Sequence, residues 1–431
     1  MVFRLNSADH DFPSAFEAIL GLKREVSDDV DRAVQAIISD VRARGDAALA
    51  DYSARFDHVD LSTLSLRISA GDVAAARAQC STQDLAALDL AASRIRAYHE
   101  QQKPTDHRFT DSLGVELGWR WSAVRAVGLY VPGGSASYPS SVLMNAIPAK
   151  VAGVDRIVMV VPTPNGLVSP LVLAAAEIAG VDEIYRVGGA QAIAALAYGT
   201  ESIQPVFKIV GPGNAYVAAA KRQVFGQVGI DMMAGPSEVV IIADKTARAD
   251  WIAADLLAQA EHDSASQPML ITDHPALGDA VAVEVDRQLA SLQRAQIAGA
   301  SWRDFGAIII VKDLVEAATL SDRLAPEHLE IMTADPDAVA LSIRDAGAIF
   351  LGENTPEAIG DYIGGSNHVL PTARSARFAS GLGVYDFMKR TSFLRCGPAQ
   401  LAAIGPAAVT LGEAEGLQAH ARSVAMRLGR G

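Results

Sequence analysis

Cysteine is nearly absent from this chain, and long apolar runs are absent altogether. Only Cys80 and Cys396 occur, far apart and outside any C-x-x-C pair, so neither a disulfide framework nor a thiolate zinc site is supported. The opening residues, MVFRLNSADHDF, hold no apolar core of signal-peptide length, and glycine, proline or charge interrupts every apolar run before membrane-spanning length. These absences predict a protein of the reducing cytoplasm with no membrane partner.

Strong positive charge is also missing. The chain carries 37 basic and 50 acidic residues, for a formal charge of −13. Its few lysine and arginine clusters are short and broken by acidic or apolar residues, so no electrostatic footprint for nucleic acid is present. We therefore expect no nucleic-acid partner.

The length and the order of predicted elements indicate more than one α/β unit. A chain of 431 residues exceeds what one hydrophobic core usually organises. Helical spacing over 30–44 and 85–102 predicts a helical opening, and from Arg125 onward short β-rich runs alternate with helical segments. The alternation resumes at Glu238, which favours a second parallel α/β unit. After Asp386 the chain is predicted to be helical, with little core of its own, which favours packing on another subunit.

We therefore predict an α/β protein with two incomplete Rossmann-like parallel domains and small N- and C-terminal helical extensions. The predicted boundaries are 1–25 for the N-terminal extension, 26–129 together with 238–381 for a catalytic domain, 130–237 for a nucleotide-binding-like domain, and 382–431 for a dimer-forming C-terminal tail.

Two segments offer paired side chains suited to metal binding or acid–base chemistry. In WIAADLLAQAEHD, Gln259 and His262 lie three residues apart and project from one face near a helix end. An amide oxygen and an imidazole nitrogen suit a borderline divalent cation such as zinc, while a surface histidine interacting with the helix dipole is the alternative. In LAPEHLEI, Glu327 and His328 form a candidate general-base pair, the alternative being an acidic turn before a buried strand.

Two further segments add carboxylates and imidazoles. GDYIGGSNHVLPT joins Asp361, a candidate metal ligand, to His368, a candidate ligand or substrate contact, through a glycine-rich turn. A turn whose polar side chains satisfy the local backbone is the alternative. Glu415 and His420 in EAEGLQAH offer another such pair, although in isolation they resemble an ordinary solvated helix face.

The usual dinucleotide fingerprint is missing. The nearest candidate for G-x-G-x-x-G, the segment GPGNAY, has Tyr216 where the third glycine is required. Gly211–Asn214 nevertheless follows a predicted strand and opens a helix, where backbone N–H groups favour an anion. VPGGSAS (131–137), after Tyr130, and GGAQ (188–191) are similar turns. Any one of them can be a simple tight turn, but three at the same edge of one sheet suggest a ligand crevice.

Taken together, separated segments resemble the ordered motifs of the histidinol dehydrogenase family over nearly the whole chain. They are GPGNAYVAAAK, DMMAGPSEVVIIAD, DLLAQAEHD, LAPEHLEI, GDYIGGSNHVLPT, ARFASGLGVYDFMK and EGLQAH. The resemblance implies the following roles: one zinc per subunit bound by Gln259, His262, Asp361 and His420; proton acceptors Glu327 and His328; Ser237, His368 and Glu415, with the zinc ligands and His328, in contact with the amino alcohol; and NAD held by Tyr130, Gln191 and Asn214.

The resemblance also implies a homodimer in which each C-terminal tail completes the partner's site, and a four-electron oxidation of L-histidinol through an aldehyde to L-histidine with two NAD. The alternative within this chemistry is a paralogous zinc and NAD dehydrogenase acting on another polar alcohol, such as a sulfonated diol. Retention of Glu415, a natural partner for an amino group, favours histidinol. A binding protein that has lost catalysis is disfavoured by the intact acid, base and metal set.

Overall fold

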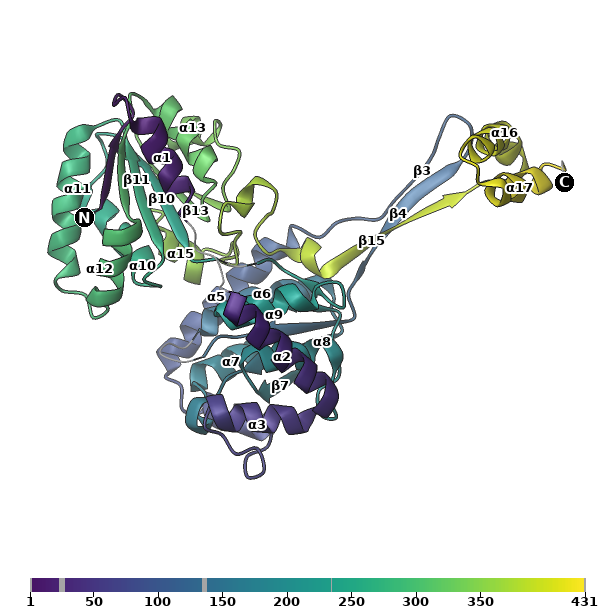
Figure 1. The fold of residues 1–431 in the computed structure, drawn as a ribbon, viewed down its shortest axis with the longest axis horizontal. Helices are drawn as coiled ribbons and strands as arrows, with labels where there is room; N and C mark the ends of the chain where they lie inside the picture. The colour runs from purple at the N-terminus through teal and green to yellow at the C-terminus, as the bar shows by residue number, and fades with distance from the viewer. Residues whose placement is uncertain (1, 23–27, 134–137, 234, 430–431) are drawn as a thin grey trace.

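The chain forms two α/β bodies and a long arm (Figure 1). The structure is a computed structural model, and it describes residues 2–22, 28–133, 138–233 and 235–429. Within these residues, no helix combines the length and the apolar character needed to cross a membrane.

The first body is built on a six-stranded parallel sheet. In spatial order its strands are β1 (Phe3–Asn6), β12 (Ala307–Ile310), β11 (Gln267–Thr272), β10 (Glu238–Ala243), β13 (His328–Met332) and β14 (Ala348–Leu351). Every residue of β10, β11 and β13 is buried, as expected for strands covered on both faces. Val240 and Ile242 enter the core on one face, whereas Val239 and Ile241 enter the core on the other.

Helices cover both faces of this sheet. One face packs against α10 (Ala249–Ala260), α11 (Pro275–Leu289) and α12 (Ala295–Phe305). The other packs against α1 (Phe12–Leu20), α13 (Leu314–Leu324) and α14 (Pro336–Ala340). The short α15 (Glu357–Tyr362) follows β14 and contacts α10.

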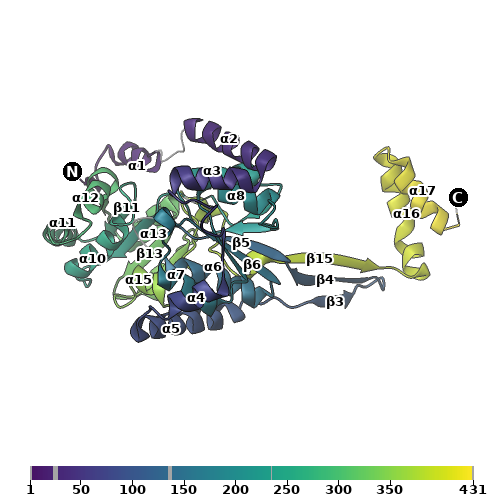
Figure 2. The same ribbon diagram turned by 90° about the horizontal axis from the view of Figure 1, so that it is seen from below.

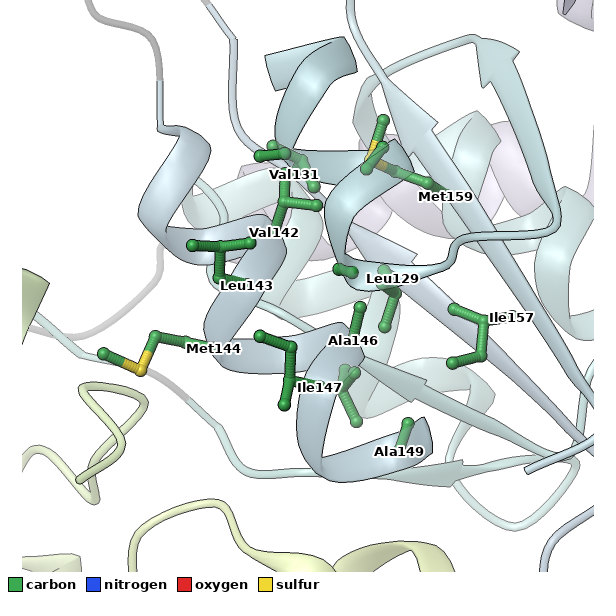
Figure 3. Packing of buried hydrophobic residues seen from close by; sticks show 14 of the residues in the cluster. Leu129, Val131, Val142, Leu143, Met144, Ala146, Ile147, Ala149, Ile157 and Met159 are labelled. Carbon is green, nitrogen blue, oxygen red and sulfur yellow. The ribbon is translucent and has the colours of Figure 1, made fainter. Parts of the chain in front are cut away.

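The second body is built on another six-stranded sheet. Its order is β2 (Arg67–Ile68), β7 (Glu183–Arg186), β6 (Arg156–Val161), β5 (Ala126–Tyr130), β8 (Lys208–Val210) and β9 (Gly229–Ile230), all parallel except the edge strand β2. One face packs against α4 (Ala70–Arg77), α5 (Thr82–Glu100), α6 (Pro139–Ala152) and α7 (Pro170–Ala179). The other packs against α2 (Asp28–Arg44), α3 (Asp46–Phe56), α8 (Gly189–Tyr198) and α9 (Ala215–Val224). Figure 3 shows part of the first of these cores, in which Leu129 and Ile157 of the strands pack with Ile147 of α6.

The arm projects from the second body, away from both sheets, as both ribbon views show (Figures 1 and 2). It consists of β3 (His107–Thr110), β4 (Glu116–Ala123) and β15 (Met388–Arg395), paired antiparallel in the order β15-β4-β3, with α16 (Pro398–Ala414) and α17 (Gln418–Arg427) at its end. The two helices pack closely, because a Cβ atom on Gly412 would lie 3.1 Å from the Ala421 backbone nitrogen.

The structure confirms the predicted α/β class with parallel sheets, but the predicted boundaries differ from the observed pairing. Residues 28–130 contribute helices α2 to α5 and strands β2 and β5 to the second body, and strands β3 and β4 to the arm. They therefore do not form the predicted single domain with residues 238–381. The N-terminal residues are not a separate extension, since β1 pairs with β12 and α1 enters the core. The tail is not wholly helical either, because β15 precedes its helices.

Candidate active site and nucleotide crevice

The predicted catalytic residues gather at the amino-terminal edge of the first sheet. Glu238 and His328 open β10 and β13, which are neighbours, and Gln259 lies in the last turn of α10. This edge lies near the second body, since a cavity of about 590 Å³ is lined by Tyr98 of α5 together with Gly360 of α15. The site thus lies at the strand ends opposite to those at which open α/β sheets usually bind ligands.

Backbone groups of β10 fix the Glu327–His328 pair. The Glu327 Oε2 atom accepts a hydrogen bond from the Glu238 backbone nitrogen at 3.0 Å, and His328 Nδ1 lies 3.1 Å from the Glu238 carbonyl oxygen. Since a carbonyl can only accept, Nδ1 carries the proton of this bond. His328 Nε2 is buried without a hydrogen bond and lies 3.7 Å from Asp361 Oδ1. The side chain therefore presents Nε2 as its reactive atom.

The backbone before this pair is held in an unusual conformation. Ala325 ends α13 with a φ of +47°, in the left-handed region that side chains other than glycine rarely adopt. This turn ends α13 just before Glu327 and His328, which are both buried at the start of β13. Strain of this kind is concentrated at functional sites.

Burial and mutual charge shift the acid–base properties of the pair. Burial raises the pKa of Glu327 to about 7, because the charged carboxylate is desolvated. Burial by itself lowers the pKa of His328, because it desolvates the charged ring. The nearby carboxylates of Glu357 and Glu327 have the larger combined effect and raise this pKa well above its usual value. In the absence of a cation, the surrounding carboxylates thus favour the protonated form of His328, while the pKa of Glu327 lies near neutral pH.

The metal ligands predicted in the first body lie close together. A further carboxylate, which the sequence did not predict, lies among them. His262, Glu357 and Asp361 each place one ligand atom within 4.8 Å of the other two. The Gln259 amide lies against the same carboxylate, with its nitrogen donating to Glu357 Oε1 at 3.0 Å and Oε2 at 3.2 Å. Glu357 and Asp361 are four residues apart on α15, so they share a face, and this spacing is the signal that could have revealed Glu357.

The donor set fits a divalent cation. Amide and carboxylate oxygens with an imidazole nitrogen are the ligands that zinc and related ions accept. The buried cluster is also rich in negative charge, because Glu327, Glu357 and Asp361 face the single imidazole of His328 within 4 Å. A buried carboxylate needs a compensating cation or hydrogen bonds. The residues present therefore fit the predicted metal, and its ligand assignment remains a prediction.

Two more predicted residues lie at this edge. His368 is half-buried, and its Nδ1 lies 3.0 Å from the Asp361 carbonyl oxygen, which closes the glycine-rich turn. Burial lowers the pKa of His368, so its neutral form is favoured. Ser237 directly precedes β10, and its carbonyl oxygen accepts from the Gln267 nitrogen at 3.0 Å. Their predicted contacts with the substrate remain predictions.

The structure does not bring Glu415 and His420 to this cluster within one chain. Glu415 caps α16 and His420 lies in α17, and both are exposed at the far end of the arm (Figures 1 and 2). If these residues act at a site of this kind, the site belongs to another subunit.

The predicted nucleotide turns follow β5, β7 and β8 at the carboxyl-terminal edge of the second sheet. The chain proceeds outward from β5 through β6 and β7 on one side and through β8 on the other, so the topological switch point lies between β5 and β8. Asn214 caps α9 there, accepting from the Tyr216 and Val217 nitrogens at 3.1 Å each. This cap orders the first turn of α9 and satisfies two of its backbone N–H groups. Residues 134–137 of the first turn lie outside the described residues.

Tyr130 and Gln191, two of the predicted NAD contacts, are buried. The Tyr130 hydroxyl accepts a hydrogen bond from the Gly189 nitrogen at 3.1 Å, and burial raises the pKa of this phenol to about 12. Tyr130 therefore ties the end of β5 to the start of α8. Gln191, on the first turn of α8, is only 2% exposed. Their predicted contacts with the cofactor remain predictions.

A buried ion pair holds the Gly211 turn. Lys221 and Asp231 form a salt bridge with side chains 4% and 1% exposed. Asp231 accepts from the Gly211 nitrogen at 2.7 Å, and Lys221 donates to the Gly211 carbonyl oxygen at 2.9 Å. Gly211 has a φ of +111°, and a Cβ atom there would lie 2.1 Å from the Tyr130 carbonyl oxygen. Only glycine fits this position.

Gly211→Ala is therefore expected to distort the crevice. We expect a loss of about 1–3 kcal/mol in the free energy of unfolding and about a tenfold or greater weakening of NAD binding, measured by thermal denaturation and fluorescence titration. Gly226→Ala is the matched control, because Gly226 has a φ of +102° but no heavy atom within 4 Å of a Cβ. Equal effects of the two substitutions on NAD binding would show that backbone strain alone, not the collision with Tyr130, matters.

Comparisons with known proteins reach across nearly the whole chain. A sequence model of the family described as "Histidinol dehydrogenase" matches residues 22–428. The chain is 65% identical over 431 residues to a histidinol dehydrogenase of Rhizobium meliloti (strain 1021), covering 100% of this chain and 99% of that protein. It is 66% identical over 428 residues to one of Nitrobacter winogradskyi, covering 99% and 100%. The crystal structure of histidinol dehydrogenase from Elizabethkingia anophelis superposes with a TM-score of 0.94 at 35% identity, covering 99% of this chain and 98% of that one.

Proposed function

The chain belongs to the histidinol dehydrogenase family, and we propose that it oxidises L-histidinol to L-histidine with two NAD at the Glu327–His328 site. The family makes it an NAD-dependent oxidoreductase of histidine biosynthesis. The observation that carries the proposed chemistry is the His328 imidazole, whose Nδ1 is fixed by a backbone carbonyl and whose Nε2 lies buried and unbonded beside the ligand cluster.

His328 acts in the first oxidation. Its Nε2 accepts the hydroxyl proton of L-histidinol as the carbinol carbon loses a hydride, which yields the aldehyde. The hydrogen bond from Nδ1 to the Glu238 carbonyl holds the tautomer and the ring orientation that this step requires.

Glu327 acts in the second oxidation. Water adds to the aldehyde, with Glu327 accepting one of its protons, and the hydrate then loses a second hydride to give the carboxylate. The Glu238 nitrogen holds the Glu327 carboxylate in place, and the pKa of about 7 allows it to alternate between acid and base near neutral pH. Water supplies the second oxygen of the product. Two hydrides leave in all, and three protons are released per histidinol.

Gln259, His262 and Asp361, with His420 of the partner subunit, would hold the zinc. When bound, this ion orients the amino alcohol and offsets the carboxylate charge around His328. Ser237, His368 and the partner subunit's Glu415 would contact the substrate, and Glu415 offers a carboxylate to its amino group.

The turns that carry Tyr130, Gln191 and Asn214 would hold NAD, which accepts the hydride in each half-reaction. The starts of α8 and α9 would suit its phosphates, because the positive ends of both helix dipoles lie at one edge of the sheet.

The position of the arm supports a homodimer. Its helices expose large apolar side chains, including Leu411 at 63% and Met426 at 61%, that a single chain leaves in water. They also carry Glu415 and His420, which are exposed at the end of the arm, away from the ligand cluster of their own chain. A partner subunit packed against the arm would cover this apolar surface, and Glu415 and His420 would reach the partner's site.

The test is the stoichiometry of NADH formation with L-histidinol, with and without a chelator. We expect about two NADH per histidinol consumed, and loss of activity after metal removal that added Zn²⁺ restores. One NADH per histidinol would indicate a simple alcohol dehydrogenase, and none would favour a binding protein without catalysis. Activity unaffected by full metal removal would contradict the metal centre.

A further inference from the structure

Glu357 lies inside the metal cluster but is not among the four ligands proposed above. Its carboxylate belongs to the same group as His262 and Asp361, with ligand atoms within 4.8 Å of one another. Its backbone nitrogen donates to Glu330 Oε1 at 2.6 Å, and its side chain is only 3% exposed. The position of this carboxylate is therefore fixed by the start of α15 and is not a chance approach of a mobile surface group.

The Gln259 amide gives a second, independent sign of a ligand. Gln259 is 1% exposed, and one end of its amide lies 3.0 and 3.2 Å from the two Glu357 oxygens. With nitrogen at that end the amide donates to the carboxylate. With the opposite orientation, the amide presents its oxygen to the Glu357 carboxylate. Two oxygens about 3 Å apart have the spacing of adjacent ligands around a cation whose metal–oxygen bonds are about 2.1 Å long. The same two side chains can thus pair with each other or share a cation.

The charge around Glu357 points the same way. Among the described residues, its one ion-pair contact is with His328, whose Nδ1 lies 3.8 Å from Glu357 Oε2 and already bonds to a carbonyl. A buried carboxylate without a close cationic partner is costly. A divalent cation among Gln259, His262, Glu357 and Asp361 removes that cost.

We propose that Glu357 is a metal ligand, and that with Gln259, His262 and Asp361 it completes a four-donor site within one subunit. This inference rests on the proposed metal centre and deepens it. In the single chain the arm carries His420 far from this cluster, so a site that needed His420 could load metal only after assembly. With Glu357 as a ligand, each subunit binds the cation by itself, and the partner's His420 joins or replaces Glu357 when the tail arrives.

The test measures Zn²⁺ affinity of full-length variants by competition with a chromogenic chelator. His420→Ala is expected to retain about one Zn²⁺ per subunit with affinity within about tenfold of wild type. Adding Glu357→Gln to His420→Ala is expected to weaken Zn²⁺ by about 100-fold or more, whereas Glu357→Gln alone has a much smaller effect, since His420 is still present. Glu353→Gln, the same change at an exposed carboxylate on the preceding loop, is the matched control and should have no effect.

The outcomes separate this inference from the metal centre itself. If Glu357→Gln in the His420→Ala background changes Zn²⁺ affinity less than about twofold, the inference is wrong. If His262→Ala binds Zn²⁺ like wild type, the metal centre is wrong and not merely the role of Glu357. Should Glu357→Gln not fold, Glu357→Asp in the His420→Ala background decides: the shorter side chain is expected to weaken Zn²⁺ binding by about tenfold or more, and an unchanged affinity overturns the proposal.

Discussion

His328→Asn is expected to lower the turnover number by about 10²–10⁴-fold while the protein keeps about one metal ion per subunit. Asparagine can still donate to the Glu238 carbonyl that His328 Nδ1 contacts at 3.1 Å, so the buried edge keeps its hydrogen bond. It offers no basic nitrogen in place of Nε2, so the hydroxyl proton of the substrate has no acceptor. The metal stays because His328 is not among its proposed ligands.

Two measurements on one preparation check this prediction, namely the NADH formation rate at saturating histidinol and the zinc content by atomic absorption. His274→Asn is the control, because His274 is exposed before α11, at the opposite edge of the first sheet, and its side chain forms no cap hydrogen bond. Loss of zinc from the His328→Asn protein would instead place His328 in the ligand shell, and unchanged turnover would exclude it as the base.

The parts of the site that the sequence predicted are those encoded by local spacing. Gln259 and His262 fall near the end of one helix, and Glu327 and His328 are adjacent, so no knowledge of the tertiary fold was needed to pair them. The buried strands were equally predictable from the sequence, since β10 and β11 are apolar on both faces and lie between helical segments.

The grouping of elements into bodies was not predictable in the same way. A helix such as α2 shows by its period which of its faces is buried, but the period does not say against which sheet it packs. Residues 28–100 lie between β1 of the first sheet and β5 of the second, and the pairing of β2 with β7 and the packing of α5 on α6 assign them to the second body. Such long-range choices depend on the whole core.

The strand at the base of the tail was missed for a different reason. The residues of β15, MKRTSFLR, are mostly exposed, because β15, β4 and β3 form a narrow sheet with little core beneath it. Without a buried face there is no alternation of apolar and polar residues to detect. Glu357 was missed because a lone glutamate four residues before Asp361 reads as an ordinary helical surface until α15 is placed against α10.

Mixing two inactive variants is expected to restore about a quarter of wild-type activity, if the tail acts on the partner's site. One variant carries His328→Asn, and the other carries Glu415→Gln with His420→Ala. Each homodimer has a defect in both of its sites. After subunit exchange, about half of the dimers are mixed. In a mixed dimer, one site combines the unchanged body of one chain with the unchanged tail of the other. The second site contains all three substitutions.

A site completed within one chain gives the opposite result, because every chain in the mixture carries a defect and activity would stay at the level of the separate variants. The His328→Asn variant mixed with a variant carrying Glu327→Gln is the control for exchange, since both residues lie at the same edge of the same body and no combination of chains yields an intact site. Recovery in the first mixture but not in the second would assign Glu415 and His420 to the partner's site, which fits their place at the end of an arm that leads away from their own chain's ligand cluster.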